Sequence, residues 1–77
     1  ETADTLLKNF ENTENECKSL LQRNLSLPAY DQCLKASHIF NLLDARGVIG
    51  VAERTGYITR IRELAKGCGA LWLSSQS

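Results

Sequence analysis

Hydrophobic side chains recur at intervals of three and four residues along most of the chain, the spacing that places them on one face of an α-helix. This pattern predicts an amphipathic first helix over residues 4–24, with a charged and asparagine-rich outer face. Thr2 or Asp4 is expected to cap its start. Glu14 falls on the apolar side, where it should weaken packing locally. The apolar positions are Leu6, Leu7, Phe10, Thr13, Cys17, Leu20 and Leu21.

A second helix is predicted over residues 28–46. Pro28 suits its first turn, where a missing N–H has no helical partner to lose, and Gly47 can adopt the positive φ that ends a helix. Leu34 and Leu42 lie off the main apolar stripe, so we expect this to be the middle helix, with protein on more than one side. The main stripe consists of Cys33, Ala36, Phe40 and Leu43.

A third helix is predicted over residues 51–73, and residues 74–77 are expected to form a tail. Gly56, Gly67 and Gly69 lie inside this helix, so its C-terminal part should either fray or pack too closely against a neighbour for side chains to fit. We find no strand pattern and no internal repeat, and the fold class predicted is an all-α three-helix bundle. The expected inward stripe of this helix is Ile58, Ile61, Ala65, Cys68 and Trp72.

A polar row interrupts the apolar positions of the second and third helices. Ser37, Asn41 and Asp44 follow one another at helical spacing with His38 beside them, and Arg54 falls inside the inward stripe of the third helix. Such groups need partners when buried. We therefore predict an ion pair between Asp44 and Arg54 that fixes the angle between the helices, and we favour this structural role over a catalytic one.

Size and charge narrow the range of functions. The 77 residues form one small domain, and the absence of methionine leads us to expect that residues 1–77 are a fragment of a longer chain. No apolar run approaches the ~20 residues that cross a bilayer, so no membrane partner is expected. Nine acidic and nine basic side chains cancel, although residues 1–31 carry a net charge of −3 and residues 32–77 one of +3.

Catalytic and metal-binding patterns are weak. The three cysteines are not at metal-ligand spacing and are expected to be buried, reduced thiols, and the single histidine is expected to be a hydrogen-bonded helix residue. The sequence GVIGVAER lacks both the ending and the preceding strand of a phosphate-binding loop. Arg60, Arg62 and Lys66 offer few cations for reading DNA, but this side of the third helix is a candidate RNA contact.

Residues 27–65, LPAYDQCLKASHIFNLLDARGVIGVAERTGYITRIRELA, closely resemble the C-terminal helical region of the α subunit of bacterial-type glycyl-tRNA synthetase, an enzyme with separate or fused α and β chains. The resemblance runs without a gap over about half of the chain. It is carried by Ala29, Tyr30, Asp31, Gln32, Leu34, Lys35, Ser37, His38, Phe40, Asn41, Leu43, Asp44, Arg46, Gly47, Glu53, Arg54, Tyr57 and Arg60.

That resemblance implies a helical appendage of a class II aminoacyl-tRNA synthetase, a ligase that uses ATP with Mg to attach glycine to tRNA. None of the three class II signature motifs is present, so we expect no cofactor in this region, no catalytic residue and no activity in isolation. The implied partners are the β subunit and the catalytic core, with tRNA as a further candidate, and the implied location is the cytoplasm or a plastid. The alternative is a free-standing helical interaction module without enzymatic activity. Candidate contact residues are Ser37, His38, Asn41, Arg46, Arg60, Arg62 and Lys66.

Overall fold

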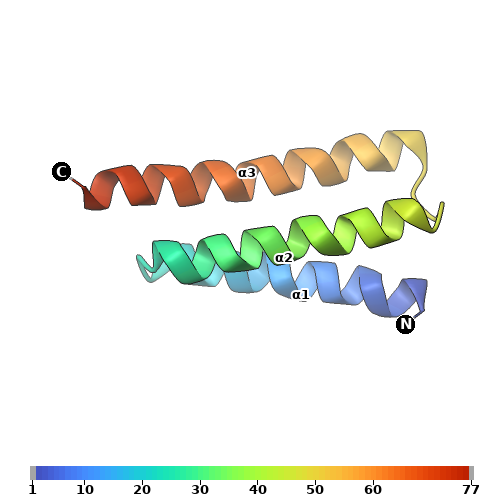
Figure 1. The fold of residues 1–77 in the computed structure, drawn as a ribbon, viewed down its shortest axis with the longest axis horizontal. Coiled ribbons are helices and arrows are strands. Elements are labelled where there is room, and N and C mark those ends of the chain that lie inside the picture. The colour runs from blue at the N-terminus through green and yellow to red at the C-terminus, as the bar shows by residue number, and fades with distance from the viewer. Residues whose placement is uncertain (1, 77) are drawn as a thin grey trace.

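Three antiparallel helices make up the structure, shown as a ribbon in Figure 1. The computed structural model describes residues 2–76, in which α1 spans Ala3–Gln22, α2 spans Ser26–Ala45 and α3 spans Val51–Ser75. No strand occurs in the described part of the chain. The predicted all-α three-helix bundle is therefore confirmed.

Local hydrogen bonds explain the two ends of α1. The Thr2 hydroxyl accepts from the backbone N–H of Thr5 at 3.1 Å, which confirms Thr2 as the predicted cap. At the other end Asn24 adopts a φ of +60°, and the N–H of Leu25 donates to the carbonyl of Leu20 at 3.0 Å. This left-handed closure stops α1 at Gln22, two residues before the predicted end, because the chain has already turned away at Asn24.

Helix α2 begins earlier than predicted and ends close to where Gly47 indicates. It starts at Ser26, so Pro28 is its third residue. The first four N–H groups of a helix have no intrahelical acceptor, and proline therefore sacrifices no hydrogen bond at that position. Gly47 has a φ of +71°, and its N–H donates to the carbonyl of Asp44 at 3.0 Å. This confirms that Gly47 closes the helix.

Helix α3 begins at the predicted residue but ends two residues later than expected. Gly50 is the N-cap, and the Glu53 carboxylate accepts from its backbone N–H at 3.0 Å. The hydroxyls of Ser74 and Ser75 donate to the carbonyls of Leu71 and Trp72. These bonds satisfy carbonyls of the last turns, and α3 continues through residues predicted to form a tail.

Helix α2 lies between α1 and α3, as Figure 1 shows, and this confirms its predicted middle position. Leu34 and Leu42 nevertheless remain exposed, so the apolar positions off its main stripe are not covered by either neighbour. The core lies mainly along the contact of α1 with α2. It consists of Leu6, Phe10, Cys17, Leu20, Ala29, Cys33, Ala36, Ile39, Phe40, Leu43, Leu64 and Cys68.

Helix α3 faces the core with Leu64 and with three of the five residues of the predicted stripe. Leu64 and Cys68 are buried, Ile58 and Ile61 are half-buried, and the other two predicted inward residues are exposed. The prediction was wrong for these two residues because α3 has apolar residues on two adjoining sides, and periodicity alone does not decide which side meets the bundle. The two exposed residues of the predicted stripe are Ala65 and Trp72.

One glycine of α3 marks a close approach to α1. A methyl group added at Gly67 would lie 2.9 Å from Cδ1 of Leu21, closer than carbon atoms pack. The close packing predicted for this part of α3 therefore holds at Gly67. It does not hold at Gly56 or Gly69, where an added methyl group would meet no atom within 4 Å.

Candidate functional site

An ion pair with two hydrogen bonds joins α1 to α3. Two nitrogens of the Arg60 guanidinium, Nε and Nη2, donate to the Glu14 carboxylate at 3.0 Å and 2.5 Å. The Glu14 side chain is only 8% exposed and that of Arg60 is 41% exposed. Lys18, one turn after Glu14 on α1, adds a second positive charge at 3.9 Å. The two-bond geometry fixes the guanidinium plane as well as its position.

Two aromatic rings complete the surroundings of Arg60. Its guanidinium carbon lies 4.9 Å from the ring centre of Phe10 and 5.0 Å from that of Tyr57, and the two rings meet edge to face. The hydrogen bond from Arg60 holds the pKa of Glu14 below its usual range, against the effect of burial. The same bond raises the pKa of Arg60. Both groups are therefore charged near neutral pH, and the contact clamps α1 against α3.

The pair predicted from the sequence forms a weaker contact at the turn between α2 and α3. Arg54 Nη2 lies 3.3 Å from Asp44 Oδ2 through a single contact. The side chains are 56% and 33% exposed, so the expected burial of Arg54 in the inward stripe was wrong. Arg54 occupies the first turn of α3, where water reaches the guanidinium. Solvent screening makes such an ion pair a minor contributor to stability.

The other polar residues selected from the sequence do not converge on one site. Ser37 is half-buried, whereas His38 and Asn41 are exposed and need no protein partner. Arg46 is the C-cap residue of α2, at the far end of that helix from the groove described below. Arg62 and Lys66 are exposed on α3, but Arg60 is already engaged by Glu14. The polar row is therefore a solvated edge and not the buried seam that its spacing indicated.

The three cysteines are buried free thiols, one on each helix. Cys17 donates from its thiol to the carbonyl of Ala29 at 3.2 Å, and burial together with the nearby thiols of Cys68 and Cys33 raises its pKa to about 12. A thiol with that pKa stays protonated and is a poor nucleophile. Residues 2–76 contain no group of three histidine, cysteine or acidic side chains able to hold a metal ion. The thiols therefore pack as small apolar groups.

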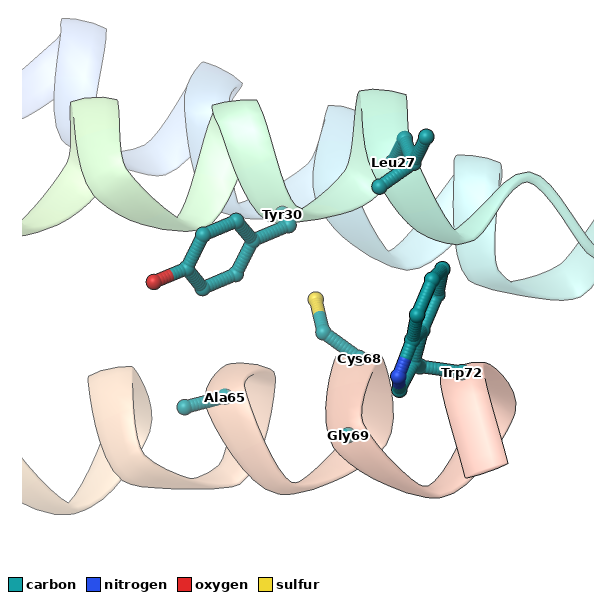
Figure 2. Close-up of a pocket in the computed structure, with 6 residues that line it drawn as sticks. All are labelled: Leu27, Tyr30, Ala65, Cys68, Gly69 and Trp72. Carbon is teal, nitrogen blue, oxygen red and sulfur yellow. The ribbon is translucent and has the colours of Figure 1, made fainter. Parts of the chain in front are cut away.

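An apolar groove of about 300 Å³ opens between the first half of α2 and the last half of α3. Figure 2 shows the Trp72 ring standing up from α3 toward Leu27, with the Tyr30 ring on the α2 side and the Cys68 sulfur pointing between the helices. Trp72 is 47% exposed and Tyr30 is 48% exposed. Sequence reasoning missed this groove, although Leu27 and Tyr30 repeat at helical spacing with Leu34. The lining residues are Leu27, Tyr30, Ala65, Cys68, Gly69 and Trp72.

The fold and the groove together define a small helical bundle that presents an apolar surface, a class suited to packing against other protein. Comparison with known proteins identifies the family. Residues 1–77 match the protein family described as glycyl-tRNA synthetase alpha subunit, and the chain belongs to that family. The glycine–tRNA ligase alpha subunit of Rickettsia bellii (strain OSU 85-389) is 51% identical over 71 residues, which cover 92% of this chain and 25% of that protein. The chain thus spans about a quarter of this relative's length.

This family assignment confirms the resemblance found from the sequence and does not favour the alternative of a free-standing module. The three-helix bundle is therefore a helical part of a protein of that family. None of the helices in residues 2–76 is long and apolar enough to span a membrane.

Proposed function

We propose that this domain is a packing appendage of glycine–tRNA ligase, supporting ATP-dependent attachment of glycine to tRNA by binding other parts of the enzyme. The groove between α2 and α3 carries the proposal. Exposed tryptophan and tyrosine side chains beside a concave apolar surface are typical of the energetic centres of protein interfaces. The catalytic core and the β subunit are the partners, and the cytoplasm, or a plastid, is the compartment in which the parent enzyme works.

The chemistry of the reaction belongs to residues outside this chain. This expectation comes from the sequence, in which none of the three class II signature motifs is present. Among the described residues, Glu14–Arg60 and Asp44–Arg54 are ion pairs between helices, whereas Lys18–Glu14 and Lys66–Glu63 lie within one helix.

A hybrid α subunit tests this function. In it, the region of the Rickettsia bellii subunit that corresponds to residues 1–77 is replaced by this chain, and the hybrid is produced together with the β subunit. We expect co-purification with the β subunit and charging of tRNA with glycine. Trp72→Ser in the hybrid should reduce charging about tenfold, because it removes a central apolar contact. Val51→Ser, 90% exposed and far from the groove, is the matched control.

A hybrid that is folded by circular dichroism but neither binds the β subunit nor charges tRNA would contradict this function. Equal activity of the Trp72→Ser and Val51→Ser hybrids would instead show that the groove takes no part in it.

Direct contact with tRNA is the second candidate, favoured by the two exposed cations Arg62 and Lys66 on the same side of α3. Phosphate contacts weaken steeply as salt rises, because counterions released on binding must be restored. Changing both residues to alanine in the hybrid should weaken tRNA binding and flatten its salt dependence. An unchanged salt slope would remove tRNA from the partners of this surface.

A further inference from the structure

We propose that the groove between α2 and α3 holds an amphipathic helix from the remainder of the same α-subunit polypeptide. This inference rests on the proposed function and specifies which part of the ligase fills the groove. The occupant would turn the three-helix arrangement into a local four-helix bundle.

The shape of the groove indicates a helix as its occupant. Its walls are two neighbouring helices, and the surface between such helices accepts a third whose side chains enter the space between them. Figure 2 shows Trp72 closing one end of the groove, with Tyr30 farther along α2. A volume of about 300 Å³ accommodates one or two apolar side chains, such as those one turn apart on a helix.

Apolar surface around the groove extends beyond the residues that line it. Leu34 follows Leu27 by seven positions on α2, so both lie on the same side of that helix, and both are more than half exposed. Exposed apolar side chains gathered on one side of a soluble protein are a mark of an interaction site. The occupant must therefore be apolar along one face for at least two turns.

Charge at the rim specifies the flanks of the occupant. Arg62 and Lys66 precede Ala65 and Gly69 by three positions, which places these cations beside the groove along α3. Lys66 also lies 3.9 Å from Glu63 on the same helix, an exposed contact that an acidic residue of the occupant would compete with. Asp31 lies between Leu27 and Leu34 on α2 and is also exposed. An occupant with acidic residues along its α3 side would pair with both cations, and a basic residue opposite Asp31 would complete the match.

The length of the relative favours an occupant in the same polypeptide. The matched region is 25% of the Rickettsia bellii subunit, so three quarters of that chain lies outside it. Linkage in one chain raises the effective concentration of a segment to about the millimolar range, so even a modest apolar contact is occupied. A segment of a separate chain would lack this raised effective concentration and would have to bind the groove more tightly to fill it.

Hydroxyl-radical footprinting read by mass spectrometry tests the occupancy. Oxidation of Trp72 and Tyr30 is compared between this 77-residue chain and the hybrid α subunit without its β partner. We expect oxidation of both residues to slow about fivefold in the hybrid, because a seated helix excludes water from the groove. Val51 and Leu42, which are exposed elsewhere, serve as internal controls and should change less than twofold. Equal oxidation of Trp72 in the two proteins would overturn the proposal.

A photoreactive benzoylphenylalanine at position 27 of the hybrid identifies what fills the groove. Cross-links to residues of the same chain outside the replaced region support the proposal, whereas cross-links between two copies overturn it. Charge reversal at Arg62 and Lys66 together should restore oxidation of Trp72 toward its level in the 77-residue chain. Lys8→Glu, a charge reversal on the exposed face of α1, is the control and should leave protection unchanged. An unaffected footprint after reversal of the two α3 cations would contradict the acidic flank.

These measurements separate the two proposals. A hybrid that charges tRNA with the β subunit but shows no protection of Trp72 leaves the proposed function standing and removes only the occupant. A hybrid with Trp72 protected but without activity supports the occupant and contradicts the function.

Discussion

Two ion pairs join different helices within residues 2–76, and they have the same chemistry but different surroundings. Glu14 and Arg60 meet through two hydrogen bonds against the rings of Phe10 and Tyr57, and Glu14 is almost fully shielded from water. Asp44 and Arg54 meet through one contact at a solvated turn. Removing one partner of the first pair should destabilise the fold strongly, because the remaining buried charge would have little water to solvate it. The lesson is that surroundings, more than the separation of charges, set the importance of an ion pair.

Arg60→Ala should have the largest effect. It leaves the Glu14 carboxylate buried with only Lys18 nearby and removes the guanidinium from both rings, so we expect the free energy of unfolding to fall by about 2–3 kcal/mol. Urea unfolding followed by circular dichroism measures the change. Arg54→Ala is the matched control and should cost less than about 1 kcal/mol. Equal losses in the two variants would show that burial does not distinguish the pairs.

Lowering the pH should weaken the Glu14–Arg60 pair and so reduce the stability of the fold. The pKa of Glu14 in the folded protein is lowered, so its stabilising effect is complete above the ordinary glutamate pKa of about 4.3 and is lost as pH falls through the lower folded value. Thermal unfolding between about pH 6 and pH 2 should therefore show a loss of stability at the acidic end. Glu14→Gln should lose less stability over this range, because it has no carboxylate to protonate. Parallel pH curves for the two proteins would refute this assignment.

The Asp44–Arg54 pair can be measured by a double-mutant cycle of Asp44→Ala and Arg54→Ala. We expect a coupling free energy of about 0.2–1 kcal/mol that declines in high salt, as for exposed pairs. Urea unfolding at low and high sodium chloride gives both quantities. A coupling above about 2 kcal/mol that persists in salt would mean that this turn is a clamp after all.

The smallest effect is expected at the same turn from Gly50→Ser. A serine hydroxyl could accept from the start of α3, completing the cap that Glu53 already provides from the other direction. An added Cβ would lie 3.4 Å from Glu53 Oε1, an ordinary contact. We expect a gain of about 0.5 kcal/mol, or about 2–4 °C in the thermal midpoint. A lower midpoint would show that the serine disturbs the existing bond to Glu53.

The successes and failures of the sequence reasoning have distinct physical causes. The six helix ends were predicted to within two residues, and most closely where one residue fixes the local geometry, as Thr2 and Gly47 do. Asn24 indicated the end of the first helix only weakly, because asparagine tolerates a positive φ but does not require one. The Asp44–Arg54 contact is local across a short turn, whereas Glu14 and Arg60 are 46 positions apart. A sequence gives no measure of which distant helix faces will meet.

A signal for the buried pair was nevertheless present. Glu14 interrupts the apolar stripe of α1, and a carboxylate in that position requires a cation from another element. Arg60 lies one turn before Leu64, which proved to be buried, so it was a candidate for that cation. Selecting Arg60 as the partner of Glu14 required knowing which side of α3 faces the bundle. The side that contains Trp72 is equally apolar, so the sequence did not decide between the two.

By itself, the sequence determined three helices, their approximate bounds, the middle position of α2 and the family to which the chain belongs. These features follow from periodicity, from residues with restricted backbone geometry, and from a pattern of residues shared with relatives. Only the tertiary structure decided which side of α3 meets the bundle. That choice buried Glu14 against Arg60 and left Trp72 exposed beside the groove, because packing a helix with two apolar sides covers one and leaves the other for a different partner.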